Sequence, residues 1–327
     1  MTRVGVYLTH ALPMKDEIRY ARLAEEKGFE SVWQGQARYH RDSVVPLAAY
    51  AASTNRVKLG TGVLHALARN VVALAVEFNT LDEIAPGRAI LGISALWDPM
   101  AHEIGIDVKK RLQAVEEYVI ALRRLFNGDV VNFEGEFVKL RNVRLTRKTT
   151  RIPVYVGATG LKMIQLAGRV GEGVVLNYLI SPEYTRQSVE TLEAAAKEAG
   201  RNPSEIDRPQ LIACSLDNDY DVAVSRLKPL LCEYLAKEPH IVKASGASEE
   251  TVQEVRRIVK ASRTESEGLA KAAHLVEDKL VERIAAVGNA EACQRKVKEY
   301  MAAGCTCPLL YSVDENVAGI VEAFSGF

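Results

Sequence analysis

Short apolar runs rich in β-branched residues alternate along the chain with longer amphipathic stretches. Nearly continuous apolar runs are typical of strands in a parallel sheet that is buried on both faces, and an apolar residue every three or four positions is typical of helices. We expect strands at Val4–Leu8, Ser31–Gln34, Val57–Gly60, Arg88–Ile93, Pro153–Gly157, Gly173–Asn177, Leu211–Ser215 and Pro308–Ser312. Eight strands with helices between them predict an α/β fold of the (β/α)8 TIM barrel type.

An open, doubly wound sheet would also alternate strands with helices. No G-x-G-x-x-G sequence follows the first strand, however, and the count of eight strands favours a closed barrel. The helix after the first strand has Asp16 and Glu17 at its N-terminal end, where the helix dipole is positive, and Gly28 at its end.

Two stretches interrupt the alternation within what we expect to be a single domain, residues 1–327. Residues 127–150 contain "NFEGEFVKL", which predicts a hairpin insertion after the fourth strand. Residues 236–287 are charged and helical in pattern and form an insertion after the seventh strand. Such helices are either solvated scaffold or, on the carboxyl side of a barrel, a lid.

Charge and composition exclude several classes of protein. Among the 327 residues, 48% are hydrophobic, and 42 Lys and Arg balance 42 Asp and Glu. There is no excess positive charge to attract nucleic acid or an anionic membrane. The N-terminal apolar run is too short for a signal peptide, and no later segment approaches the roughly 18 apolar residues of a membrane span. We therefore expect a soluble, cytoplasmic protein.

The cysteines give no sign of a disulfide framework or a metal site. The chain has 5 cysteines, an odd number, and they are widely scattered, which fits a reducing compartment. Cys305 and Cys307 form a C-x-C pair without a second pair at zinc-ligand spacing. We expect no bound metal.

The turn after the fifth strand is a candidate anion site. Gly157-Ala158-Thr159-Gly160 allows the backbone to approach a ligand closely, and a helical pattern begins at Leu161. The unpaired N–H groups and the positive dipole at that helix terminus would hold an anion, of which phosphate is the first choice. Alternatively, the glycines serve only a tight turn between strand and helix.

Other candidate groups follow the third and fourth strands, because the active site of a (β/α)8 barrel lies at the carboxyl ends of its strands. Gly62 and Val63 follow the third strand and His65 comes shortly after; a glycine bulge with a capping histidine is the simpler interpretation. Ser94 and Trp97 follow the fourth strand. Trp97 is either a cover over the barrel mouth or a core residue.

The loop after the second strand is rich in hydrogen-bonding side chains, although a solvated loop would have a similar composition. These side chains are Gln36, Arg38, Tyr39, His40 and Arg41.

Several stretches at matching spacing resemble the bacterial luciferase-like oxidoreductase superfamily. They are "AEEKGFESVW", "VKLGTGV", "LDEIAPGRAILGIS" and "IPVYVGATGLKMIQLAGRVGEGVVLN". The match runs from Val4 to about Asn177, with a looser remainder, and is strongest to the coenzyme F420-dependent branch that includes the methylenetetrahydromethanopterin reductases.

The resemblance implies a flavin or deazaflavin at the carboxyl-terminal mouth of the barrel. It implies a non-prolyl cis peptide at Gly62-Val63, pressed against the back of the ring, and a phosphate held by Gly157–Gly160. The residues that we expect at the cofactor site are Gln36, Gly62, Val63, His65, Ser94, Gly157, Ala158, Thr159 and Gly160.

The chain departs from the family pattern where acid and base groups are usual. Gln36 and Ala37 stand where members carry an acidic residue followed by histidine, Trp97 stands near a common carboxylate, and Tyr7 stands where the reductases have glutamate in the first strand. The identity of any general acid is therefore open.

Three side chains are candidates for the polar contact that the family's acid and base groups would otherwise provide. His65 is the first choice as a polar contact to the cofactor ring, because it should project toward the barrel mouth. His40 and Arg38 are the alternatives, in the loop after the second strand.

The resemblance implies an F420-dependent oxidoreductase that transfers hydride between the deazaflavin and a small organic substrate, such as a CH–NH reaction like that of the methylenetetrahydromethanopterin reductases. An FMN-dependent monooxygenase and a non-catalytic flavin-binding protein are the alternatives. We also expect a homodimer or homotetramer, formed through an apolar helix that carries Val72, Ala75, Val76 and Leu81.

Overall fold

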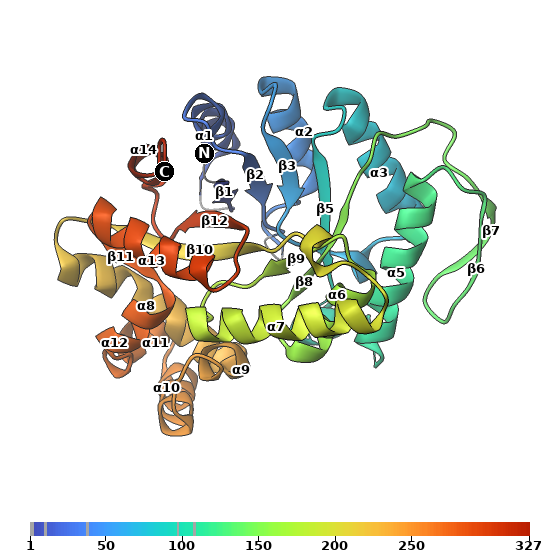
Figure 1. The fold of residues 1–327 in the computed structure, drawn as a ribbon. Helices are drawn as coiled ribbons and strands as arrows, with labels where there is room; N and C mark the ends of the chain where they lie inside the picture. Colours follow the sequence, from blue (N-terminus) through green and yellow to red (C-terminus); the bar gives the residue numbers. More distant parts are fainter. Residues whose placement is uncertain (1–2, 10–11, 37–38, 97, 107–108) are drawn as a thin grey trace.

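Eight parallel strands form a closed barrel in the computed structural model, which describes residues 3–9, 12–36, 39–96, 98–106 and 109–327 (Figure 1). The strands are β1 (Gly5–Leu8), β2 (Ser31–Gln34), β3 (Lys58–Thr61), β5 (Ala89–Ser94), β8 (Val154–Ala158), β9 (Gly173–Leu176), β10 (Pro209–Leu216) and β12 (Cys307–Ser312). The pairing of β10 with both β9 and β12 closes the barrel. The predicted (β/α)8 barrel is confirmed, and each predicted strand boundary lies within two residues of the observed one.

Helices surround the barrel and connect consecutive strands. They are α1 (Met14–Glu26), α2 (Val44–Ser53), α3 (Val71–Ile84), α4 (Asp98–Glu103), α5 (Arg111–Phe126), α6 (Leu161–Val170), α7 (Pro182–Glu198), α8 (Tyr220–Lys237), α13 (Ala290–Ala302) and α14 (Val317–Ala323). Among the described residues, none of the helices is long and apolar enough to cross a membrane.

Two groups of elements lie outside the simple alternation. Between β5 and β8, β6 (Val131–Glu134) and β7 (Lys139–Val143) pair as an antiparallel hairpin beside α5. Between β10 and β12 lie α9 (Pro239–Lys243), α10 (Glu249–Ala261), α11 (Glu265–Ala272), α12 (Asp278–Ile284) and β11 (Ala286–Gly288). Helices α10 to α12 pack against α8, as Figure 1 shows in orange.

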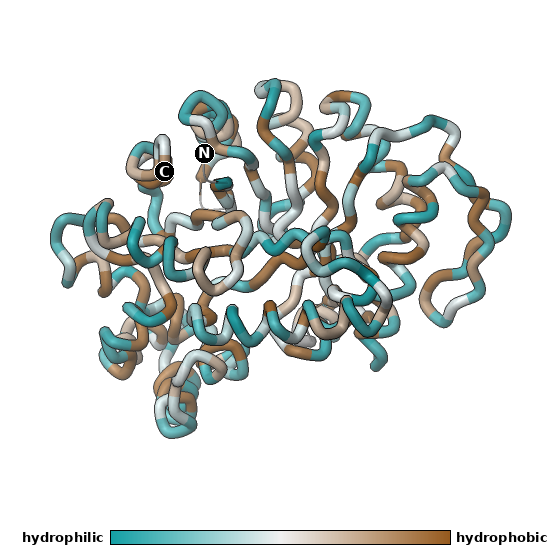
Figure 2. The backbone as a smooth tube through the Cα atoms, viewed as in Figure 1, coloured by the Kyte–Doolittle hydropathy of each residue, from teal (hydrophilic) through white to brown (hydrophobic). Residues whose placement is uncertain are grey.

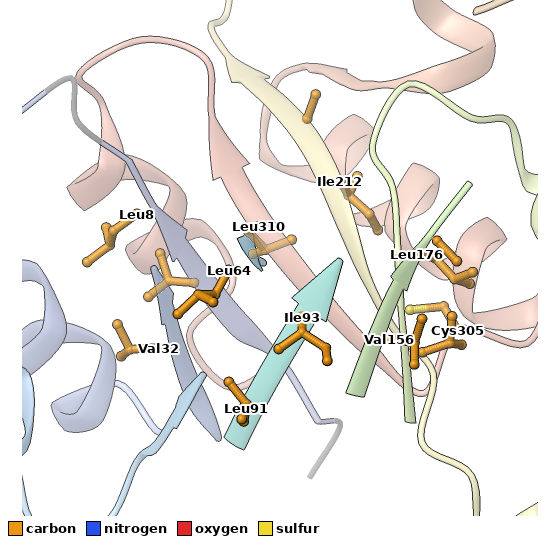
Figure 3. Packing of buried hydrophobic residues seen from close by; sticks show 14 of the residues in the cluster. Leu8, Val32, Leu64, Leu91, Ile93, Val156, Leu176, Ile212, Cys305 and Leu310 are labelled. Carbon is orange, nitrogen blue, oxygen red and sulfur yellow. The ribbon is translucent and has the colours of Figure 1, made fainter. Parts of the chain in front are cut away.

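The main core lies between the barrel and its helices. Alternate strand residues point outward, and buried side chains such as Val32, Ile93 and Ile212 form one continuous cluster there (Figure 3). Figure 2 shows the corresponding pattern along the chain, with apolar stretches in the central strands and hydrophilic positions along the surrounding helices.

A second, smaller cluster fills the inside of the barrel. Trp33 and Tyr155 are buried there, with ring centroids 6.1 Å apart. Gly60 leaves room for the indole, because a Cβ at that position would come within 2.4 Å of the Trp33 ring. The hydroxyl of Tyr155 donates to Asp207, which also accepts two hydrogen bonds from Arg3 near the start of the chain. Large aromatic rings thus close the interior below the mouth.

Glu17 lies in the first turn of α1, as predicted, and also links α1 to neighbouring elements. It is fully buried, and its Oε2 accepts from the Tyr50 hydroxyl at 2.7 Å and pairs with Arg41 at 2.8 Å. Burial raises the pKa of Glu17, opposed by these two partners. The carboxylate therefore links α1 to α2 and to the loop after β2 rather than facing solvent.

The apolar surface of α3 also differs from the expectation. Ala75 and Leu81 are buried in the core of this chain and cannot form a contact between subunits. The exposed apolar side chains of this region are instead Val76 and Ile84 on α3 and Val45 on α2, which packs beside α3.

Candidate active site at the mouth of the barrel

A cavity of about 580 Å³ opens at the carboxyl ends of the barrel strands. Eight of the nine predicted site residues line it: Gln36, Gly62, Val63, His65, Ser94, Gly157, Ala158 and Thr159. Gly160 is not among the described residues that line the cavity; it directly precedes α6. The sequence therefore located the cavity from the strand ends alone, as expected for this barrel type.

The third strand is interrupted at the cavity. β3 ends at Thr61, a cis peptide joins Gly62 to Val63, and the chain continues as β4 (Leu64–His65), which pairs with β5. The Thr61 hydroxyl donates to the carbonyl of Gly92 at 2.7 Å and accepts from its N–H at 2.9 Å. These bonds fix the turn, and the cis peptide lies where the resemblance implied it.

The Val63 side chain packs onto the backbone of Gly157 across the mouth. A Cβ on Gly157 would lie 2.8 and 2.9 Å from the two methyl carbons of Val63, a distance that real Cβ atoms essentially never show. Gly157 is therefore required for close approach, whatever its role toward a ligand. Val63 and Gly157 together form an apolar part of the cavity wall.

The turn after β8 presents an uncapped helix terminus. Gly160 is the N-cap of α6 and has no side chain that could accept a hydrogen bond from the first turn of this helix. The N–H groups of Met163 and Ile164 donate to the Gly160 carbonyl at 2.9 and 3.1 Å. The preceding N–H groups, at Leu161 and Lys162, lie in the part of a first turn that has no partner within the helix. This geometry suits an anion, as the sequence predicted.

Hydrogen bonds hold the anion turn in place from both sides. Thr159 Oγ1 accepts from the Asn177 side chain at 2.9 Å, and its carbonyl accepts from the Tyr184 hydroxyl at 2.9 Å. Asn177 follows β9 and also lines the cavity. The turn is thus tied to the next strand and to α7.

His65 is neutral at physiological pH. Burial, with a smaller contribution from the Arg69 charge, lowers its pKa to about 4. Its Nδ1 is buried and has no hydrogen-bond partner among the described residues, while its backbone N–H donates to Gln36 at 3.3 Å. A neutral imidazole with an unpaired buried nitrogen is suited to a polar contact with a ligand and is a poor source of protons.

Sequence reasoning missed a group of tyrosines in the cavity. Tyr7, Tyr178, Tyr234 and Tyr311 all line it, and their rings make a chain of edge-to-face contacts with centroids 5.3 to 5.6 Å apart. They come from the strands β1 and β12, the loop after β9, and α8. One signal could have revealed them. Tyr7 and Tyr311 lie on neighbouring strands and are paired there, so their side chains point into the barrel together.

The loop after β2 contributes in part. His40 lines the cavity beside Gln36, whereas Tyr39 is exposed and donates to Glu103, and Arg41 pairs with Glu17. Ala37, Arg38 and Trp97, which the sequence also singled out, lie outside the described residues.

Replacing Gly157 with alanine should destabilise the protein, because the new Cβ would displace Val63. The loss should be roughly 1–3 kcal/mol, measured by denaturant unfolding. Gly160→Ala is the matched control, since nothing lies within 4 Å of its Cβ position and its φ of −72° suits any residue. Equal stability of the two variants would contradict the Val63 contact.

Replacing His65 with alanine should flatten the acid side of the stability profile. In the folded wild type, burial lowers the pKa of His65 to about 4, below the ordinary histidine value of 6.5. The unfolded chain therefore binds more protons between these values, and stability present above pH 6.5 is lost as the pH falls toward 4. Melting temperatures measured from pH 8 to 4 should fall less steeply in His65→Ala. Parallel curves would show that His65 is not buried as described.

Comparison with known proteins agrees with this geometry. Residues 1–307 match the family model of the luciferase-like monooxygenases. The 5,10-methylenetetrahydromethanopterin reductase of Archaeoglobus fulgidus is 30% identical over 290 residues, which cover 88% of this chain and 86% of that protein. An F420-dependent glucose-6-phosphate dehydrogenase of Kineococcus radiotolerans is 33% identical over 61% of this chain and 64% of its own length.

The fold has close counterparts among solved structures. The coenzyme F420-dependent tetrahydromethanopterin reductase of Methanopyrus kandleri superposes with a TM-score of 0.88 over 99% of this chain and 98% of the other, at 23% identity. That likeness shows a common fold, and the family model covers nearly the whole sequence. The chain therefore belongs to the luciferase-like monooxygenase family.

Proposed function

We propose that this protein is an F420-dependent oxidoreductase that transfers hydride between the deazaflavin ring and a small organic substrate. The observation that carries the proposal is an apolar wall formed by Val63 and Gly157 in the cavity, next to the lining residues Ala158 and Thr159, which lead directly into the N-terminus of α6. The wall suits the face of a planar ring, and the helix terminus suits the phosphate attached to it. The name of the dehydrogenase relative supports F420 as the cofactor, and the name of the reductase relative supports a reduction.

The residues of the cavity fit such a cofactor. Gly157 carries no side chain where a Cβ would collide with Val63, so Val63 keeps its place in the wall. The buried Nδ1 of His65 lacks a partner among the described residues and is available to a polar edge of the ring. Bound F420 would supply the hydride at its C5 carbon. We propose His65 as a polar contact to that ring.

We base the proposed substrate class on the relatives and the proposed cellular location on the cysteines. A CH–NH reaction like that of the methylenetetrahydromethanopterin reductases is our first choice, given similarity over most of both chains. A cytoplasmic location is consistent with five cysteines that are all free and buried.

The second candidate is an FMN-dependent monooxygenase. The family model that matches this chain is named for monooxygenases, and an uncapped helix terminus would hold the phosphate of FMN equally well. A non-catalytic flavin-binding protein is the third candidate, because Ala37 replaces a usual histidine.

Titration of the protein with F420 and with FMN, followed by the absorption of the cofactor, tests the proposal. We expect F420 to bind more tightly. Gly160→Val should raise the dissociation constant about tenfold or more, because a lost charge-assisted hydrogen bond costs roughly 1.5–3 kcal/mol. Gly160→Ala is the control for a small side chain at the same position. Preference for FMN would favour the second candidate, and F420 binding without turnover of any acceptor would favour the third.

We also propose a homodimer or larger assembly formed through α2 and α3. Val76 and Ile84 are two helical turns apart on one face of α3, and they are 49% and 46% exposed. Val45 on the adjacent α2 is 72% exposed. Exposed apolar side chains gathered on neighbouring helices are typical of subunit interfaces.

Replacing Val76 and Ile84 together with glutamate should dissociate the assembly, because charges in an apolar contact remain without partners. Sedimentation velocity should then show a species near 36.0 kDa in the variant and a larger one in the wild type. Val130→Glu is the control, since this residue is 50% exposed beside the hairpin, away from α3. A wild-type protein that sediments near 36.0 kDa would rule the interface out.

A further inference from the structure

Two tyrosine hydroxyls form a hydrogen bond inside the cavity. The oxygens of Tyr178 and Tyr234 are 2.5 Å apart, and their rings meet edge to face with centroids 5.3 Å apart. Tyr178 follows β9 at the barrel mouth, and Tyr234 lies on α8 with Leu230 and Lys237 on the face that lines the cavity. The pair therefore connects the barrel to the helix that covers it.

The fold fixes the position of Tyr178. The next residue, Leu179, is fully buried with a φ of 63°, a left-handed conformation that is rare for leucine and persists only when its surroundings impose it. The Ser245 hydroxyl donates to the Leu179 carbonyl at 3.3 Å and accepts from the Ser181 N–H at 2.8 Å. Tyr300 donates to the carbonyl of Ile180 at 2.7 Å. The segment around α9 and the helix α13 thus both hold this turn.

The tyrosine pair has one hydroxyl proton that it can donate to a ligand. Two hydroxyls carry two protons, and only one of them lies between the two oxygens. Neither Tyr178 nor Tyr234 donates to another of the residues that the structure describes. Burial raises the pKa of both side chains, so both stay protonated at neutral pH. One O–H is therefore available to a ligand in the cavity.

The other polar groups of the cavity are less suited to supply a proton. His65 is neutral, because burial lowers its pKa to about 4. The ammonium of Lys237 is held by the carboxylates of Glu233 and Glu265. Tyr7 and Tyr311 contact each other through their rings, and among the described residues neither hydroxyl has a hydrogen-bond partner that could return a proton after its loss.

We propose, on the basis of the proposed hydride transfer, that the Tyr178–Tyr234 pair is the hydrogen-bond and proton donor to the substrate. The hydride forms a bond to the carbon of a C=N or C=O group, and the π electron pair moves to the nitrogen or oxygen. That atom takes the proton of the outward O–H, and the proton between the two oxygens moves to the vacated one. A proton from solvent then restores the pair, and the oxidised deazaflavin would release one proton to solvent, so charge and atoms balance.

The surroundings of the pair define the substrate class. Aromatic rings and Leu230 surround it, and of the described lining residues only Lys237 carries an ammonium or guanidinium, already paired with carboxylates. A phosphorylated substrate would find little compensation for its charge here. A neutral imine or ketone on an apolar ring fits both the aromatic contacts and the donor.

Binding of p-nitrophenolate to the cofactor-free protein tests the donor directly. Its aryl ring fits an aromatic cavity, and its oxygen accepts a hydrogen bond as the substrate atom would in the reaction. We expect the wild type to bind it, and the double variant Tyr178→Phe/Tyr234→Phe to bind it at least about tenfold more weakly, the loss expected for a hydrogen bond to a charged group. Each single variant should lose nearly as much, because the two hydroxyls act as one unit.

Tyr118→Phe is the matched control. It also removes a buried hydroxyl, one that donates to the Arg69 carbonyl at 2.7 Å away from the cavity. It should bind the phenolate as the wild type does, and melting temperatures should show that all variants are folded. Absence of binding in the wild type, or equal binding in the double variant, would overturn the proposal.

A kinetic measurement tests proton donation itself. Protein loaded with reduced F420 should reduce 2-methyl-1-pyrroline or cyclohexanone, and the double variant should be slower by about 10²–10⁴-fold with its F420 dissociation constant unchanged. A loss below threefold, or no reduction of either acceptor by the wild type, would overturn the proton-donor role. Failure of the wild type to bind F420, with phenolate binding intact, would instead count against the proposed function alone.

Discussion

The contact between Val63 and Gly157 is the constraint on which the rest of the site depends. It brings the turn after β3 against the end of β8, across β5, which lies between them in the sheet. Val63 follows a cis peptide, and the contact requires a residue without Cβ on the facing strand. Backbone and two methyl groups form this part of the cavity wall. Any larger residue at position 157 would displace Val63 from it.

The barrel separates stability from function along its axis. Below the cavity, Trp33 and Tyr155 fill the interior, and Tyr155 reaches Asp207 at the opposite end. Burial opposes the ionisation of Asp207, but hydrogen bonds from Arg3 and Thr306 outweigh it and hold its pKa below the usual value. This end is ion-paired and filled, whereas the mouth contains glycines, hydroxyls and an open volume. The packing at the filled end of the barrel therefore compensates for unfavourable conformations at the mouth.

The features that could be predicted from the sequence are those determined by residues that are adjacent in the sequence. Strand positions were predictable because apolar runs in a buried parallel sheet are continuous, and the anion turn was predictable because its glycines are adjacent. The Tyr178–Tyr234 pair was not, because 56 residues separate its members and a left-handed Leu179 directs one of them. The links from Glu17 to Tyr50 and Arg41 were not predictable either, because the sequence does not place these residues beside it.

The electrostatics of the mouth favour hydride chemistry on a neutral group. Burial lowers the pKa of His65 and raises that of Tyr7, Tyr178 and Tyr311, so each of these side chains is uncharged at neutral pH. The Glu and Lys side chains that line the cavity, Glu233, Lys237 and Glu238, lie instead at the C-terminal end of α8 and directly after it. Charge that develops on a substrate during reaction would then meet fixed hydroxyl dipoles in a site of low dielectric constant, where such dipoles act most strongly. A barrel wall of uncharged imidazole and tyrosine side chains, faced by the hydroxyls of Tyr178 and Tyr234, lets a neutral substrate enter and stabilises the charge that the reaction creates.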